Sequence, residues 1–176
     1  MNPIATLHMA NGRNIVIELL PESAPNTVNS FIYTASRGYL DHHAIERIVP
    51  GNWVDVSYTA FGKKECRYLI PNEFELNPDV VPLDSHPGAV CMGGYGEAGL
   101  AGCEFFFPLR DCPDHKGIYP VFGRVLEGMD ELYRLEKVET VPVTDFPIEG
   151  VEVNRPVKPE IIERVELELH GEIYPE

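Results

Sequence analysis

The sequence is organised around one stretch, Gly102-Cys103-Glu104-Phe105-Phe106-Phe107-Pro108-Leu109. Side chains of a strand alternate between its two faces, so Phe105 and Phe107 share one face, and Glu104 and Phe106 share the other. A buried carboxylate without a partner is costly, and an acid beside an aromatic therefore makes a poor core surface. We expect Phe105 and Phe107 in the core, and Glu104 with Phe106 facing a partly wet groove. The stretch alone fits equally well a strand buried on both faces, with Glu104 marking its edge.

Short strands precede this stretch. Residues 4–8 and 14–19 flank Asn11-Gly12, which is a strong hairpin signal. A strand over residues 44–51 carries Arg47 and ends at Pro50-Gly51, and alternation continues from residue 52 to residue 61. Residues 89–92 predict a further strand, whereas residues 93–102 contain too many glycines for regular structure.

Two helices and a final strand complete the pattern. Apolar residues recur at helical spacing from Pro25 to Gly38 and again over residues 129–135. Val165, Leu167 and Leu169 alternate with glutamates and predict a half-buried strand, whereas residues 140–160 are expected to form an irregular excursion before it. Many short strands without strand-helix-strand alternation favour one domain over residues 1–176, an antiparallel barrel or sandwich.

Composition and charge restrict the partners. The chain has 176 residues with 14 Lys+Arg and 28 Asp+Glu, a formal net charge of −14. Such a chain lacks the basic surface that neutralises phosphates, so no nucleic acid is expected as a partner. No apolar run is long enough to span a bilayer and the first residues do not resemble a secretory signal, so we expect no membrane association and a cytoplasmic location. One sealed acidic barrel also favours a monomer.

The cysteine pattern indicates neither disulfides nor a metal site. Cys66, Cys91, Cys103 and Cys112 show no Cys-x-x-Cys spacing, and we expect reduced thiols. Cys112 and His115 could form half a metal site, but no second half is evident in the sequence. We therefore expect neither metal nor cofactor.

Seven segments share their order and spacing with one known family. They are residues 17–28 (IELLPESAPNTV), 38–41 (GYLD), 47–51 (RIVPG), 72–74 (NEF), 88–92 (GAVCM), 104–106 (EFF) and 119–130 (YPVFGRVLEGMD). Together they resemble the cyclophilin-type peptidyl-prolyl cis-trans isomerases, in particular single-domain bacterial members. The resemblance implies a closed, eight-stranded antiparallel β-barrel capped by two α-helices. It also implies an enzyme that accelerates rotation about X-Pro bonds in unfolded or folding proteins.

The chemistry of that reaction needs few groups. Amide resonance sets a barrier of about 20 kcal/mol, and uncatalysed rotation takes tens of seconds or more. Twisting the bond pyramidalises the prolyl nitrogen, so a donor aimed at that nitrogen stabilises the twisted state more than the planar ones. An apolar pocket must hold the pyrrolidine ring meanwhile. Arg47 can supply the donor and Phe106 a wall of the pocket, with no nucleophile, metal or cofactor.

The resemblance assigns roles to further residues. Arg47 matches the family's catalytic arginine, although by itself it could equally form a surface ion pair with Glu46 or Asp55. Phe106 resembles the aromatic floor of the proline pocket, Tyr119 its rim and His115 a wall that leucine usually forms. The resemblance also places at substrate-binding positions Met92, Phe105, Gly93, Gly94, Glu104, Trp53 and Asp55.

Several positions depart from the family pattern. After Pro-Gly the chain has Asn52, Trp53 and Asp55, where the family usually shows an aromatic, a methionine and a glutamine. Glu104 replaces a second glutamine, and Glu46 replaces a histidine. We expect Trp53 to form the apolar wall that Asn52 vacates, and the Pro-Gly turn to bring Asp55 back towards the arginine. The groove should be more acidic than is usual and favour basic or extended peptides.

Two other functions remain open from the sequence. The departures are compatible with a cyclophilin-like module that binds proline-containing peptides with weak or no turnover. A barrel that binds a small molecule would need a large open cavity, and the bulky set of Phe105, Phe107 and Val121 predicts a filled interior instead.

Overall fold

Antiparallel strands make up most of the fold. The computed structural model describes residues 1–56, 63–146 and 148–175. The strands are β1 (Ile4–Met9), β2 (Asn14–Leu19), β3 (His43–Ala44), β4 (Arg47–Val49), β5 (Trp53–Asp55), β6 (Leu69–Ile70), β7 (Ala89–Gly94), β8 (Leu100–Pro108), β9 (Val121–Glu127), β10 (Thr140–Pro142), β11 (Asn154–Pro156) and β12 (Ile161–Glu168). The helices are α1 (Pro25–Ser36), α2 (Glu73–Leu76) and α3 (Met129–Glu136), with short 3-10 turns η2 (Lys64–Cys66), η3 (Gly96–Ala98) and η4 (Pro113–His115).

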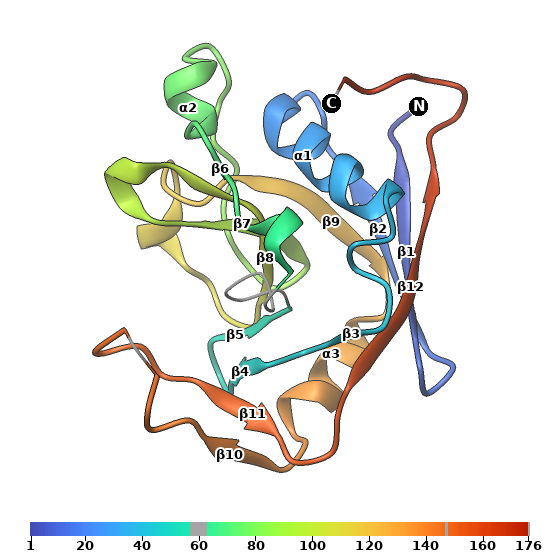
Figure 1. The fold of residues 1–176 in the computed structure, drawn as a ribbon. Coiled ribbons are helices and arrows are strands. Elements are labelled where there is room, and N and C mark those ends of the chain that lie inside the picture. Colours follow the sequence, from blue (N-terminus) through green and yellow to red (C-terminus); the bar gives the residue numbers. More distant parts are fainter. Residues whose placement is uncertain (57–62, 147, 176) are drawn as a thin grey trace.

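One ten-stranded sheet curls around the core in the order β3-β12-β1-β2-β9-β7-β8-β5-β4, with β6 also paired to β8. The mainly β, antiparallel architecture confirms the prediction, but the expected closed ladder of eight strands is not formed. In the described ranges, β3 and β4 end opposite edges of the sheet without pairing to each other. Only residues 45–46 separate these strands in the sequence, so the chain itself bridges the two edges. Helices α1 and α3 cover opposite ends of the curl (Figure 1).

The first hairpin forms as its sequence predicts. Gly12 has a φ of 87°, which glycine adopts at little cost, and the backbone N–H of Arg13 donates to the side-chain oxygen of Asn11 at 2.9 Å. Ile15, Ile17 and Leu19 lie on the inner face of β2 and are buried. At the other end of the chain, β12 pairs with β1 and β3, and its residues Val165 and Leu167 are half-buried as expected.

The strand that carries the three phenylalanines divides them as predicted. Phe105 and Phe107 lie in the main core, where Phe105 meets the ring of Phe31 from α1 edge-on at 5.3 Å between ring centres. Phe106 belongs to a separate cluster on the opposite face. The alternation of a strand therefore decides which rings stabilise the fold and which face the groove.

Two predicted irregular segments hold regular structure. β7 continues through Gly93 and Gly94, because a register shift there lets the strand remain paired with β8. Residues 140–156 contain the two-stranded sheet β10-β11, whose strands pair only with each other in the described chain. Proline residues and polar composition conceal these short strands in the sequence. Residues 57–61 of the predicted alternating segment lie outside the described residues.

No helix in the described ranges has the length and apolar character needed to cross a membrane.

Candidate active site

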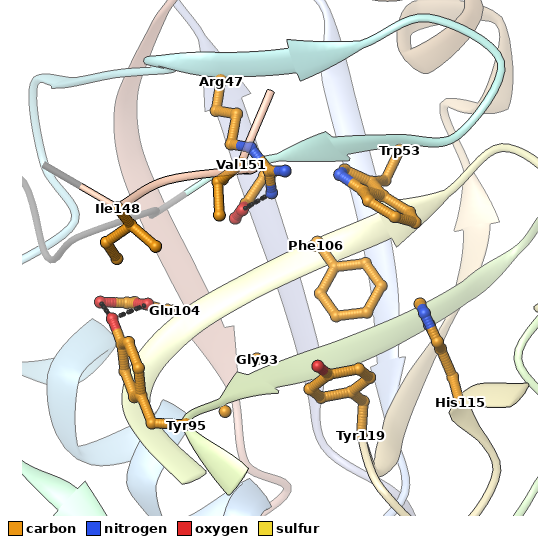
Figure 2. A pocket seen from close by; sticks show the side chains of 12 residues that line it. Arg47, Trp53, Gly93, Tyr95, Glu104, Phe106, His115, Tyr119, Ile148 and Val151 are labelled. Atoms are coloured by element: carbon orange, nitrogen blue, oxygen red, sulfur yellow. Dashed lines mark hydrogen bonds and ion pairs between the residues drawn. The ribbon is translucent and has the colours of Figure 1, made fainter. Parts of the chain in front are cut away.

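The groove-facing side of β8 borders a cavity of about 320 Å³. Figure 2 shows the residues that line it, which come from β4, β5, β7, β8, the turn between β7 and η3, the loop around η4 and the segment between β10 and β11. The lining residues are Arg47, Trp53, Asp55, Gly93, Gly94, Tyr95, Glu104, Phe106, His115, Tyr119, Ile148 and Val151. Strands β4, β5, β7 and β8 fix most of these positions, so the cavity is built on the rigid sheet.

Four rings form an aromatic cage at one end of the cavity, namely Phe106, Trp53, His115 and Tyr119. The Phe106 ring centre lies 6.1 Å from Trp53, 5.9 Å from His115 and 6.0 Å from Tyr119, and all three contacts are edge-on. His115 and Tyr119 are closer, at 4.8 Å. Edge-on packing leaves the ring of Phe106 as the floor of an apolar site.

His115 contributes an apolar wall rather than a charge. The backbone N–H of Tyr119 donates to its carbonyl at 3.0 Å, which fixes the turn that carries both residues. Burial lowers the pKa of the His115 imidazole, because the charged form loses its hydration. Its Nδ1 atom is buried without a hydrogen-bond partner in the described chain. At neutral pH, His115 therefore presents an uncharged ring to the cage.

Arg47 lines the cavity, and two hydrogen bonds hold its side chain. Antiparallel pairing of β4 and β5 places it directly opposite Asp55, and its Nη1 donates to Asp55 Oδ2 at 2.9 Å. Its Nε donates to the backbone carbonyl of Glu152 at 2.7 Å. The side chain is 12% exposed, so this is a pair inside the cavity and not the surface pair that the sequence left open. The guanidinium thus has a fixed orientation.

Two carboxyl groups lie beside this arginine. Burial raises the pKa of Asp55 to about 7, Arg47 opposes that shift, and the nearby charge of Glu104 adds to it. Tyr95 holds Glu104, with its hydroxyl 2.7 Å from both carboxylate oxygens (Figure 2). The polar part of the cavity therefore combines one fixed cation with two acids, one of which titrates near neutral pH.

The segment between β10 and β11 forms the remaining wall. We call β10, β11 and the described residues 143–146 and 148–153 between them the strap. Ile148 and Val151 of the strap line the cavity on the arginine side (Figure 2). Asn154 anchors the strap to the sheet, because its side-chain nitrogen donates to the Ile48 carbonyl of β4 at 3.1 Å. The strap therefore both encloses the cavity and, through Glu152, holds the arginine.

The structure brings together most of the residues predicted from the sequence, with two corrections. Met92 and Phe105 do not line the cavity; they face each other across β7 and β8 and are fully buried in the main core. Alternation turns them away from the groove, although their neighbours in sequence line it. Among the residues predicted for the groove, those that do line it are Arg47, Trp53, Asp55, Gly93, Gly94, Glu104, Phe106, His115 and Tyr119.

Sequence reasoning missed Tyr95, Ile148 and Val151. Tyr95 is the one aromatic in the glycine-rich segment, and that signal could have identified it. Ile148 and Val151 are isolated apolar residues in a segment without periodicity, and no sequence signal marks them. Asn52 lies outside the cavity lining while Trp53 is part of it, as expected.

The cysteines lie apart from this cavity. All four are reduced, buried thiols, and Cys112 is fully buried beside η4. Within the described ranges, no three metal-ligating side chains gather in one place.

The fold and the cavity together define a class of protein, namely a curled antiparallel sheet with an apolar site for a ring beside a fixed arginine. A solved structure described as a cyclophilin type peptidyl-prolyl cis-trans isomerase of Cryptosporidium parvum shares this fold, with a TM-score of 0.74 and 16% identity over 96% of this chain and 98% of that one. The family model for "Cyclophilin type peptidyl-prolyl cis-trans isomerase/CLD" matches residues 4–167. The chain belongs to this family.

Curated relatives agree with that assignment. The chain is 31% identical over 153 residues to peptidyl-prolyl cis-trans isomerase-like 1 of Gibberella zeae, covering 87% of this chain and 91% of the relative. It is 30% identical over 152 residues to the mouse peptidylprolyl isomerase domain and WD repeat-containing protein 1, covering 85% of this chain but only 23% of that longer protein. These relatives are eukaryotic and give no support to the bacterial type of member that the sequence suggested.

Proposed function

We propose that the protein is a peptidyl-prolyl cis-trans isomerase acting on X-Pro bonds of peptides and of unfolded or folding proteins. Arg47 is the donor to the prolyl nitrogen, and the aromatic cage holds the pyrrolidine ring. One observation carries the proposal: an arginine fixed at two points lines the same cavity as the floor ring Phe106. A further solved structure of the same fold, with a TM-score of 0.72, is described as the Cryptosporidium parvum isomerase in the presence of the dipeptide Ala-Pro.

The mechanism follows from where charge develops. As the X-Pro bond twists, resonance is lost and the lone pair of the prolyl nitrogen becomes localised, so that it can accept a hydrogen bond. A guanidinium is a planar group of N–H donors, and the contacts with Asp55 and Glu152 fix its orientation in the cavity. A donor that is already oriented needs little reorganisation when the twisted state forms, so its hydrogen bond lowers the barrier. The cage meanwhile fixes the ring, so that rotation moves the acyl side.

A binding module without turnover is the second candidate. The observation that favours it is the carboxylate of Asp55, which lies 2.9 Å from Arg47 and offsets the positive charge offered to the substrate. In that case the cage would still bind proline-containing peptides, but Arg47 would stabilise the twisted state of the X-Pro bond only slightly.

The test compares Arg47→Ala with a matched control, Arg110→Ala. Each guanidinium lies 5.6 Å from the Trp53 ring centre, but only Arg47 lines the cavity. In an NMR exchange assay on a short X-Pro peptide, Arg47→Ala should lower turnover by about 10²-fold. Arg110→Ala should keep most of the turnover, and thermal unfolding should show that both variants are folded.

Three outcomes separate the candidates. Peptide binding without turnover in the unaltered protein would establish the binding module. Equal losses of turnover in both variants would mean that the reaction needs the packing of arginine on Trp53 and does not need a hydrogen bond from Arg47. Loss of activity together with equal loss of thermal stability in Arg47→Ala would identify a structural ion pair.

We also propose that residues 1–176 act as a single domain and a monomer in the cytoplasm, without a cofactor. Pairing of β12 with β1 supports one domain, because it joins the two ends of the chain in one sheet. The filled core around Phe105 and Phe107 argues against a small-molecule barrel. Val121, predicted to face the interior with them, packs against Phe106 in the outer cluster.

A further inference from the structure

Two of the four cysteines lie side by side, outside the candidate active site. Cys66 and Cys103 are 37 residues apart in the sequence, but they form one small buried cluster with Tyr39 packed against it. The Cys103 thiol donates to the backbone carbonyl of Cys66, with 3.1 Å between Sγ and the oxygen. The two thiols also share a hydrogen bond with each other. The proposed function gives this pair no role.

The backbone holds both cysteines in place. Cys66 ends the 3-10 turn η2, where its N–H donates to the Lys63 carbonyl at 3.1 Å. Cys103 lies in β8 directly after Gly102, whose N–H donates to the Tyr68 carbonyl at 2.9 Å. Main-chain contacts therefore bring the two thiols together. Because the thiols already touch, only a short movement separates them from the S–S distance of about 2 Å in a disulfide.

The two thiols differ in their access to small molecules. Cys66 lines a second cavity of about 310 Å³, whereas Cys103 is 1% exposed and is not among its lining residues. This cavity shares Tyr95 and Glu104 with the candidate active site, so the two cavities are neighbours. A small solute that enters the second cavity therefore meets Cys66 before it meets Cys103.

The two thiols also differ in how readily they ionise. The hydrogen bond from Cys103 lowers the pKa of Cys66; burial opposes this shift, and the charges of Lys63 and Glu65 act in opposite directions. The same hydrogen bond raises the pKa of Cys103, and burial adds to that shift. The thiolate is the form of cysteine that attacks an electrophile. Cys66 is therefore suited to attack, with Cys103 remaining beside it as a thiol.

We propose that Cys66 and Cys103 form a redox site, in which a peroxide converts the two thiols into one disulfide. The Cys66 thiolate attacks one peroxide oxygen, so that an S–O bond forms, the O–O bond breaks and hydroxide leaves. The Cys103 sulfur then attacks the Cys66 sulfur of this sulfenic acid, so that the S–S bond forms and a second hydroxide leaves. The two protons lost by the thiols convert both hydroxides to water. The pair gives up two electrons, peroxide accepts them, and a small-molecule dithiol reverses the change by thiol–disulfide exchange.

Cys91 and Cys112 serve as internal controls. Both are fully buried, and burial is the main cause that raises the pKa of each thiol, to about 12 for Cys91. Neither is among the residues that line the second cavity. We therefore expect both to stay reduced under conditions that oxidise Cys66.

The experiment treats the reduced protein with hydrogen peroxide, removes the peroxide, unfolds the protein and counts its thiols. We expect the number of thiols to fall from four to two, with a mass loss of two hydrogen atoms and no dimer on a non-reducing gel. A peptide digest should contain one linked pair, Cys66 with Cys103. Dithiothreitol should restore all four thiols.

Serine variants separate the attacking thiol from the resolving one. In Cys103→Ser, whose hydroxyl can still donate to Cys66, no disulfide should form, and dimedone, which labels sulfenic acids, should mark Cys66. In Cys66→Ser, neither the disulfide nor the label should form. The control Cys91→Ser should still lose two thiols. Thermal unfolding checks that each variant is folded, and the digest of the unaltered protein decides the matter where a variant is not.

The other outcomes overturn the redox site. Survival of all four thiols would show that peroxide does not oxidise Cys66. A linked pair that contains Cys91 or Cys112, or one that joins two protein molecules, would place the oxidation elsewhere. Irreversible oxidation of Cys66 without a disulfide would show that Cys103 cannot reach it. Isomerase activity enters none of these measurements, so failure of the redox site and failure of the proposed function are distinguishable.

Discussion

Replacing Asp55 by asparagine tests whether the charge of this carboxylate weakens Arg47 as a donor. Asparagine keeps the shape and the acceptor oxygen, so it removes the charge alone. The arginine should stay in place, because the Glu152 carbonyl still accepts from its Nε at 2.7 Å. We therefore expect D55N to be more active than the unaltered protein. Asp55→Gln, which restores the residue that the family usually has, should act in the same direction.

The size of the effect follows from the type of hydrogen bond that is exchanged. A bond between two charged groups contributes about 1 kcal/mol more than one to a neutral partner. If that difference is returned to the bond with the prolyl nitrogen, kcat/KM rises by about five-fold.

The unaltered protein should also respond to pH. The pKa of Asp55 is raised to about 7, so protonation below neutral pH should raise its kcat/KM towards the value of D55N. His115 lines the same cavity, but its lowered pKa places its titration further into the acid range. Glu104, the other acid in the cavity, is present in both proteins, so the comparison cancels its contribution.

Stability provides an independent readout with a defined sign. A carboxyl whose folded pKa lies above its unfolded value adds stability below the unfolded pKa, and that stability is lost as pH rises through the folded pKa. For Asp55 the window runs from the usual 3.8 to about 7. Between about pH 6 and pH 8 the loss covers roughly one pH unit and amounts to about 1.4 kcal/mol. D55N should lack this part of the pH dependence.

The assay is NMR exchange on one X-Pro peptide at several pH values, with urea unfolding of both proteins at the same values. The reasoning fails if D55N is less active at every pH. That result would identify the carboxylate as the partner that positions the arginine, with the Glu152 contact insufficient alone.

Three further predictions address the pocket, the strap and the cysteines. Phe105→Ala should lower the free energy of unfolding by about 3–5 kcal/mol, because it opens a cavity in the main core. Phe106→Ala should lower it by less, but should bind a proline peptide several-fold more weakly. Unchanged binding of that peptide to Phe106→Ala in an NMR titration would refute the pocket assignment. Asn154→Ala removes one anchor of the strap and should lower kcat by about three-fold with little change in KM. Arg155→Ala, at the exposed neighbouring residue, should leave kcat unchanged. A change in KM alone in Asn154→Ala would mean that the strap contacts substrate without positioning the arginine. All four cysteines should react as thiols once the protein is unfolded without reductant, and a smaller number would reveal a disulfide.

Sequence patterns predicted those parts of the fold that depend on interactions between residues close together in the sequence. The turn at Asn11-Gly12 and the alternation of Glu104, Phe105 and Phe106 each follow from a few neighbouring residues, and the structure confirms them. For Phe105, the alternation predicted the position of the side chain better than the family resemblance did. The resemblance gave this residue a supporting position for substrate binding, whereas the two-residue period of a strand places it in the core.

The strap could not be predicted because nothing local specifies it. Its strands are three residues long and carry prolines, so they show no alternation. The contact that matters most for the site comes from a backbone carbonyl, that of Glu152, and any residue at that position could supply it. Its partner lies 105 positions away in the sequence. Only the packing of the strap against β4 reveals that the arginine has a second anchor.

The departures from the family pattern at residues 52 to 55 act together. Asn52 lies outside the cavity and accepts a hydrogen bond from Arg110 at 2.7 Å. The guanidinium of Arg110 lies 5.6 Å from the centre of the Trp53 ring, and Trp53 forms the apolar wall in place of residue 52. The ring site is thus kept although its residues changed. The change at position 55 is not balanced in this way, because pairing of β4 with β5 places residue 55 opposite Arg47 whatever charge that residue carries. Differences from other family members should therefore appear in kcat, and not in affinity for the proline ring.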